Sequence, residues 1–155
     1  RSIALAPTFV AFTPWTTPEG YLALLERLVA LRLVESVPPV QLAIRLLVPQ
    51  GSRLLELPGF REKLSPFDSG LLGYPWRHPD PRVDCLQRDV QAMVARGEQD
   101  GLSRRDVFAA VWRMAHDAAG RRTPPLPSGL GDAIPRLSEP WYCCAEPTEQ
   151  QLNSF

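Results

Sequence analysis

The sequence has no excess of either charge, no long apolar run and only three cysteines. Its 17 basic and 17 acidic residues cancel, and a chain without a basic surface is poorly suited to general binding of nucleic acid or anionic membranes. No apolar run reaches the roughly 18 residues of a membrane span, and the first residues lack a signal-peptide pattern. An odd number of cysteines without framework spacing is typical of a reducing compartment. We therefore expect a soluble, cytoplasmic protein without nucleic-acid or membrane partners.

Several well-known site motifs are also missing. The sequence contains no GxGxxG, P-loop, HExxH or GxSxG pattern, so it gives no motif-level sign of the corresponding nucleotide, metal or hydrolase sites. Cys143, Cys144 and the two histidines do not have the ligand spacing of a zinc site. We therefore predict no metal ligands in this chain.

Proline, in contrast, is abundant. The chain has 17 prolines in 155 residues, more than twice the average usage of about 5%, so much of the chain must turn or be extended. Residues 123–140 are especially rich in proline. Such a segment has a stiff, extended character, and we predict that it is an arm that carries the C-terminal tail to another surface.

Two adjacent cysteines mark that tail. They stand in the run Trp141-Tyr142-Cys143-Cys144-Ala145-Glu146-Pro147. Consecutive Cα atoms lie about 3.8 Å apart, below the usual disulfide range of about 4.4 to 6.8 Å. A bond between Cys143 and Cys144 would therefore be strained and easily reduced, as in labile or catalytic couples. The alternative is that both are ordinary free thiols, since Glu146 would raise a thiol pKa rather than lower it.

The motif Cys143-Cys144-Ala145-Glu146-Pro147 resembles the tail that names the CUAEP/CCAEP-tail radical S-adenosylmethionine proteins, whose second position is selenocysteine or cysteine. Cys144 occupies that exchangeable position. Other stretches are similar to the C-terminal part of those enzymes: Pro7-Thr8-Phe9, Phe12 to Thr17, Gln41 with Ile44 to Pro49, Gly51-Ser52, and Trp76 with His78 to Pro81. The family's CxxxCxxC motif and its cobalamin-binding domain are absent, and the chain opens at Arg1 without a methionine. We expect the C-terminal part of a longer enzyme.

The resemblance implies cofactors, a partner and residue roles. A [4Fe–4S] cluster and S-adenosylmethionine would bind the full-length protein, with the use of cobalamin left open, and none of them would bind this chain alone. The partner would be the upstream barrel of the same polypeptide, and the small-molecule or peptide substrate stays unknown. Cys144 would be the reactive thiol and Cys143 its resolving partner. Phe12, Thr13 and Trp15 would help to enclose S-adenosylmethionine, although Trp15 packing on the next helix is an equally good interpretation.

The predicted fold class is α+β and mainly helical. It consists of the last strand of a barrel, a helical C-terminal region and an extended proline-rich tail. The segments are residues 1–37, the last strand and helix of a partial (β/α) barrel; residues 38–122, a helical domain with an aromatic loop; and residues 123–155, the arm and the Cys-Cys tail.

The first elements follow from composition. Ile3–Phe12 is apolar and rich in β-formers, which predicts a buried strand. A helix follows from Pro18, capped by Thr16 or Thr17; its Leu-rich run, Tyr21–Val34, is apolar on nearly every face and predicts burial on more than one side. Val40–Val48 weakly favours a strand.

Arg45 lies inside the apolar run Val40–Val48. A buried arginine must be paired or must bind an anion. Its partner is either a cofactor or substrate carboxylate or, more commonly, a carboxylate of the chain itself.

The aromatic loop, residues 60–79, has no periodicity and ends at His78 and Asp80. These two side chains have the chemistry of a general acid–base pair. We favour the alternative that Asp80 is the N-cap of the next helix, with Pro81 in its first turn, and leave His78 open.

Two amphipathic helices are predicted between the aromatic loop and the proline-rich arm. The first runs from Pro81 to about Arg96, with Gly97 as its stop. The second begins with the capping box of Ser103 and Asp106 and runs to Gly120. The spacing predicts an antiparallel hairpin in which His116 packs on Trp112.

Two other functions remain open from the sequence. The chain could be a thiol-redox module that acts alone through its adjacent cysteines, or a helical interaction domain without chemistry. The apolar first helix disfavours both, because it predicts neighbours that this chain does not supply.

Overall fold

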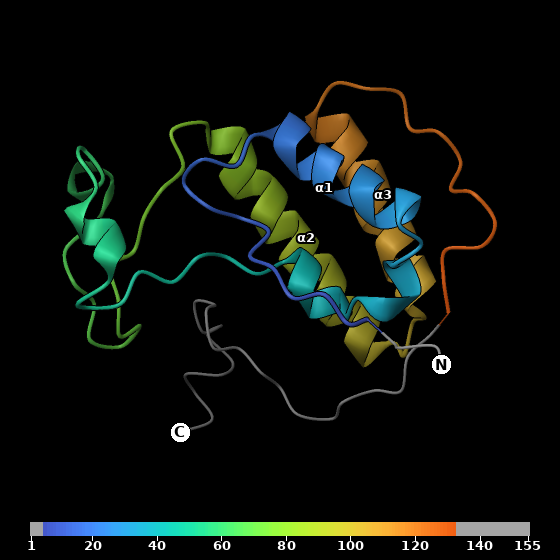
Figure 1. Cartoon of the computed structure of the whole chain (residues 1–155), viewed down its shortest axis with the longest axis horizontal. Helices are drawn as coiled ribbons and strands as arrows, with labels where there is room; N and C mark the ends of the chain where they lie inside the picture. Colours follow the sequence, from blue (N-terminus) through green and yellow to red (C-terminus); the bar gives the residue numbers. More distant parts are fainter. Residues whose placement is uncertain (1–4, 133–155) are drawn as a thin grey trace.

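The computed structural model describes residues 5–132. It contains three α-helices, α1 (Pro18–Ala30), α2 (Pro81–Gln99) and α3 (Arg104–Ala118). Four short 3₁₀ turns cover Val34–Ser36, Pro39–Leu42, Arg53–Glu56 and Arg61–Lys63. Figure 1 shows the three helices packed together as a body, while the segment around residues 50–75 (green) stands apart from them. The mainly helical character predicted from the sequence is confirmed.

Helix α1 forms where its capping signals predict it. The Thr17 side chain accepts a hydrogen bond from the Gly20 amide, and Pro18 occupies the first turn. The helix ends at Ala30, four residues before the predicted limit, and Arg32 follows with a positive φ of 55°. Its buried side chains are those that share one face: Pro18, Tyr21, Leu22, Leu25 and Leu28.

The other face of α1 corrects the prediction of burial on several sides. Glu19, Ala23, Glu26 and Arg27 are exposed there. The buried face packs chiefly on α3. The apolar residues of this helix are therefore satisfied mainly by the chain's own helices.

Helices α2 and α3 form the predicted antiparallel hairpin, the most extensive contact between elements. Gly97 lies within α2 rather than ending it. A Cβ at this position would come within 2.5 Å of Val107 Cγ2, on α3. The glycine allows close approach of the two helices. The helix ends instead at Gln99, with Asp100 as its C-cap and Gly101 in the left-handed region, φ 66°. Ser103 caps α3 and bonds Asp106 as predicted.

The main core joins side chains from all three predicted segments of the chain. Phe12 and Leu22 come from the first, Val90 and Val111 from the second, and Leu130 from the third; each is at most 1% exposed. A second, smaller cluster is formed by Val48, Phe60 and Trp76. We call the segment that contains it, residues 46–77, the aromatic lobe.

The strand predicted over Ile3–Phe12 is not present as a strand in the described residues. Only Phe12 pairs: it forms an isolated parallel bridge with Arg45, in which the Phe12 amide donates to Ile44 O at 2.9 Å and its carbonyl accepts from the Leu46 amide at 2.9 Å. Leu5 is largely exposed. A strand requires a neighbouring ladder, and residues 5–12 form only this one bridge.

The strand weakly predicted over Val40–Val48 is wrong: Pro39–Leu42 is a 3₁₀ turn, and Arg45 forms only an isolated bridge. Side chains take the carbonyls that a sheet would have used. Tyr21 Oη donates to Leu42 O at 2.9 Å, and Gln87 Nε2 donates to Ala43 O at 3.3 Å.

Within the part of the chain that the structure describes, no helix has the length and apolar character of a membrane span.

Candidate functional site

The four described residues that were predicted to bind a cofactor lie along the junction between the helical body and the aromatic lobe. Phe12 and Arg45 face each other in the parallel bridge, and Thr13 and Trp15 follow Phe12 directly. The predicted catalytic pair, Cys143 and Cys144, lies outside the described residues.

The Phe12 side chain has no solvent-exposed surface that a ligand could contact. It is fully buried and stacks on Tyr21, with ring centroids 4.6 Å apart and an interplanar angle of 26°. Its contribution is to the core beneath the junction rather than to a cavity wall.

Thr13 and Trp15 form the turn that leads into α1. Thr13 Oγ1 lies 3.0 Å from Thr16 Oγ1 and accepts from the Trp15 amide at 3.3 Å. Trp15 is 51% exposed and stacks on Phe60 of the aromatic lobe, with centroids 5.2 Å apart. The tryptophan therefore joins the body to the lobe, and one face of its ring remains at the surface.

Arg45 forms the structural salt bridge that was the commoner of its two predicted roles. Its Nη1 donates to Asp84 Oδ1 at 2.8 Å, and its Nη2 donates to Trp76 O. The guanidinium also lies over the Trp76 ring, 3.6 Å from the centroid. Asp84 uses its second oxygen to accept from the His78 amide at 3.1 Å. This network fastens the end of the aromatic lobe to α2.

His78 and Asp80 do not form a side-chain acid–base pair. The Asp80 carboxylate caps α2 by accepting from the Arg82 amide at 2.9 Å, as predicted, and it is also held by the Arg82 guanidinium at 2.7 Å. The hydrogen bond from the Arg82 side chain, followed by that from its backbone, lowers the pKa of the Asp80 carboxyl. His78 Nδ1 lies 2.9 Å from the Asp80 amide nitrogen and 3.0 Å from Asp80 O, so the ring contacts the backbone of Asp80 rather than its carboxylate.

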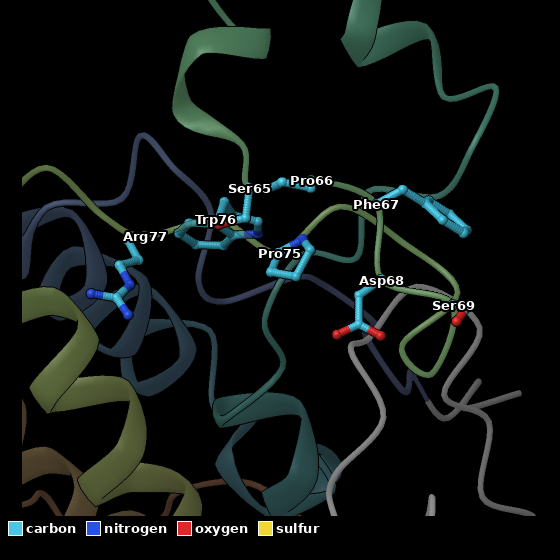
Figure 2. A pocket seen from close by; sticks show the side chains of 8 residues that line it. All are labelled: Ser65, Pro66, Phe67, Asp68, Ser69, Pro75, Trp76 and Arg77. Carbon is cyan, nitrogen blue, oxygen red and sulfur yellow. The ribbon is translucent and has the colours of Figure 1, made fainter.

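The aromatic lobe contains a hollow that the sequence did not reveal. It has a volume of about 500 Å³ and is lined by Ser65, Pro66, Phe67, Asp68, Ser69, Pro75, Trp76 and Arg77. Figure 2 shows Arg77 on one side, Asp68 and Ser69 on the other, and Pro75 and Trp76 between them. The prolines and aromatic residues of residues 60–79 were its signal in the sequence, but no motif marked Asp68 or Arg77 as lining it.

His116 and Cys85 make contacts within the helical body. His116 is buried, contacts the Trp112 ring with centroids 4.4 Å apart and lies 2.8 Å from Trp112 O, as predicted from its spacing. Cys85 is exposed, and its Sγ accepts from Arg88 Nη2 at 3.2 Å. In residues 5–132, no three His, Cys, Asp or Glu side chains are grouped as a metal would require.

Comparison with protein-family models, with curated proteins and with solved structures finds no match to this chain.

Proposed function

We propose that this chain is the C-terminal part of a cytoplasmic radical S-adenosylmethionine enzyme, covering its barrel and delivering the Cys143–Cys144 pair to the active site. The observation that carries the proposal is the tail motif Cys143-Cys144-Ala145-Glu146-Pro147, together with the similar stretches upstream. Cys144 is the reactive thiol and Cys143 its resolving partner. The chain does not catalyse the reaction alone.

The residues of this chain do not fit the [4Fe–4S] cluster that such an enzyme uses. The CxxxCxxC motif is absent from the sequence, and the described residues group no metal ligands. In this proposal the cluster and S-adenosylmethionine bind the upstream part of the polypeptide. Phe12, buried under the junction, and Arg45, paired with Asp84, support the shape of the junction, whereas Trp15 offers an exposed face.

The direct test is the intact mass of the naturally expressed protein, with sequencing of whatever precedes Arg1. We expect an upstream region that contains CxxxCxxC. A natural polypeptide that begins at or near Arg1 would contradict the proposal.

A thiol-redox module that acts alone is a second candidate, and the packing of α1 favours it. Helix α1 buries one face against the chain's own helices and exposes polar residues on the other, so the helical body forms a main core from its own side chains. This candidate predicts that the isolated chain loses two alkylatable thiols within one monomer on mild oxidation and regains both on reduction.

A further inference from the structure

The hollow in the aromatic lobe is lined by two stretches of backbone that are paired with each other. The Ser65 amide donates to Pro75 O at 2.7 Å. Asp68 and Gly73 form an antiparallel bridge and exchange both backbone hydrogen bonds, at 2.9 and 3.2 Å. Because Ser65, Pro75 and Asp68 all line the hollow, the spacing of its walls is set by backbone pairing rather than by flexible side chains.

Trp76, which also lines the hollow, is anchored by three contacts. Its indole Nε1 donates to Leu46 O at 2.7 Å, its carbonyl accepts from Arg45 Nη2, and the Arg45 guanidinium lies over its ring. The residue is only 3% exposed. A site whose walls are already fixed loses little conformational freedom when a ligand binds, so the hollow is a preformed site.

Opposite charges lie at the two ends of the hollow. Figure 2 shows Arg77 at one end and Asp68 at the other. Within residues 5–132, neither side chain forms an ion pair. Arg77 is exposed, and Asp68 Oδ1 accepts from the amides of Gly70 and Leu71 at 2.8 and 3.2 Å. Asp68 Oδ2 has no hydrogen-bond partner among these residues, so both charges are available to a ligand.

The surface between the two charges carries groups that a peptide can contact. Pro75 and Phe67 supply apolar carbon; Phe67 is 41% exposed, and its ring is held by an edge contact with Tyr74, with centroids 5.3 Å apart. Ser65 and Ser69 line the same hollow, and a hydroxyl can both donate to and accept from the backbone of a ligand. Apolar walls with a few polar groups that fix orientation are typical of ligand-binding sites.

We infer that this hollow binds a short, extended peptide with free ends, whose carboxylate pairs with Arg77 and whose ammonium group pairs with Asp68. Its volume of about 500 Å³ lies within the range of about 300 to 1,000 Å³ that ligand-binding sites have. Because the two charges lie at opposite ends, a ligand that meets both must be elongated, and an extended chain adds about 3.3 to 3.6 Å per residue. The site uses neither cysteine of the tail, so it goes beyond the proposed function and does not depend on it.

The test is a heteronuclear NMR titration of the isotope-labelled chain with tri-, tetra- and penta-alanine, which carry the same two end charges at increasing separation. We expect at least one of them to cause saturable shifts of the Ser69 and Arg77 amides and of the Trp76 indole. The N-acetylated and C-amidated forms of that peptide each lack one charge and should bind about twofold to fivefold more weakly. The absence of a saturable shift with all three peptides would overturn the inference, as would equal affinities of the charged and blocked forms.

Two substitutions assign the charges to their residues. Arg77→Gln removes the guanidinium, and Asp68→Asn removes the carboxylate charge while its amide oxygen can still accept from the turn. Each should weaken the free peptide about twofold to fivefold, but Arg77→Gln should not further weaken the C-amidated form, nor Asp68→Asn the N-acetylated form. Arg53→Gln is the matched control, because Arg53 is 93% exposed in the same lobe and does not line the hollow. Resonances of the helical body verify that each variant is folded, and unchanged affinity in both Arg77→Gln and Asp68→Asn would contradict the inference.

Discussion

The guanidinium of Arg45 lies over the ring of Trp76, 3.6 Å from its centroid, while its Nη1 pairs with Asp84 at 2.8 Å. One side chain thus connects the aromatic lobe to α2. The pair is largely shielded, with side-chain exposures of 13% for Arg45 and 26% for Asp84. Loss of one partner would leave the other charge poorly solvated.

Arg45→Ala is expected to lower the free energy of unfolding by about 2 to 4 kcal/mol, since it removes a shielded ion pair and a stacked cation together. Urea denaturation of the purified chain measures the change. Arg53→Ala is the control, because the Arg53–Glu56 pair is 93% and 70% exposed and such pairs contribute at most about 1 kcal/mol. Equal effects of the two substitutions would contradict the assigned role of Arg45.

Gly97→Ala tests the close approach of α2 and α3. Helix propensity alone predicts a gain of about 1 kcal/mol for this change, but the clash with Val107 at 2.5 Å predicts a net loss of about 1 to 3 kcal/mol. Thermal denaturation decides the sign. Adding Val107→Ala provides room for the new methyl group, so the two substitutions together should destabilise by less than the sum of their separate effects. Additive effects would show that the contact does not limit the packing.

Tyr21 gives the fold a dependence on alkaline pH. Burial raises the pKa of its hydroxyl well above the usual value near 10. The unfolded chain therefore loses this proton at a lower pH than the native chain, and the stability due to Tyr21 is full below about pH 10 and falls above it. Tyr21→Phe should lack this decline, measured as the urea midpoint between pH 8 and 11, and should cost about 1 to 2 kcal/mol at pH 7 because Leu42 O loses its donor. An identical alkaline decline in the variant would contradict the assignment.

Local signals in the sequence predicted the helix starts well. Thr17, Asp80 and Ser103 cap the three helices because a cap depends on residues only two or three positions away. Gly97 was misinterpreted as a stop because a glycine favours both a helix end and a close contact. The residue that decides between them, Val107, lies across the hairpin.

Long-range pairing limited the rest of the prediction. The need of Arg45 for a partner was evident, but Asp84 lies 39 positions away and nothing local identified it. The strand over Ile3–Phe12 depended on neighbours that the sequence could not supply, and the described part of that segment forms only the bridge between Phe12 and Arg45. Residues 123–140 were predicted as an extended arm. The docking of residues 123–132 depends on the turn at Arg32, whose carbonyl oxygen lies against Gly131.

The role of the tail thiol is the central claim, and turnover of the complete enzyme with Cys144→Ser tests it most directly. We expect activity to fall at least tenfold while Cys85→Ser, which alters an exposed thiol on α2, keeps wild-type activity. Cys143→Ser should retain single-turnover product formation but lose repeated turnover. Full multiple-turnover activity of Cys144→Ser would contradict the account.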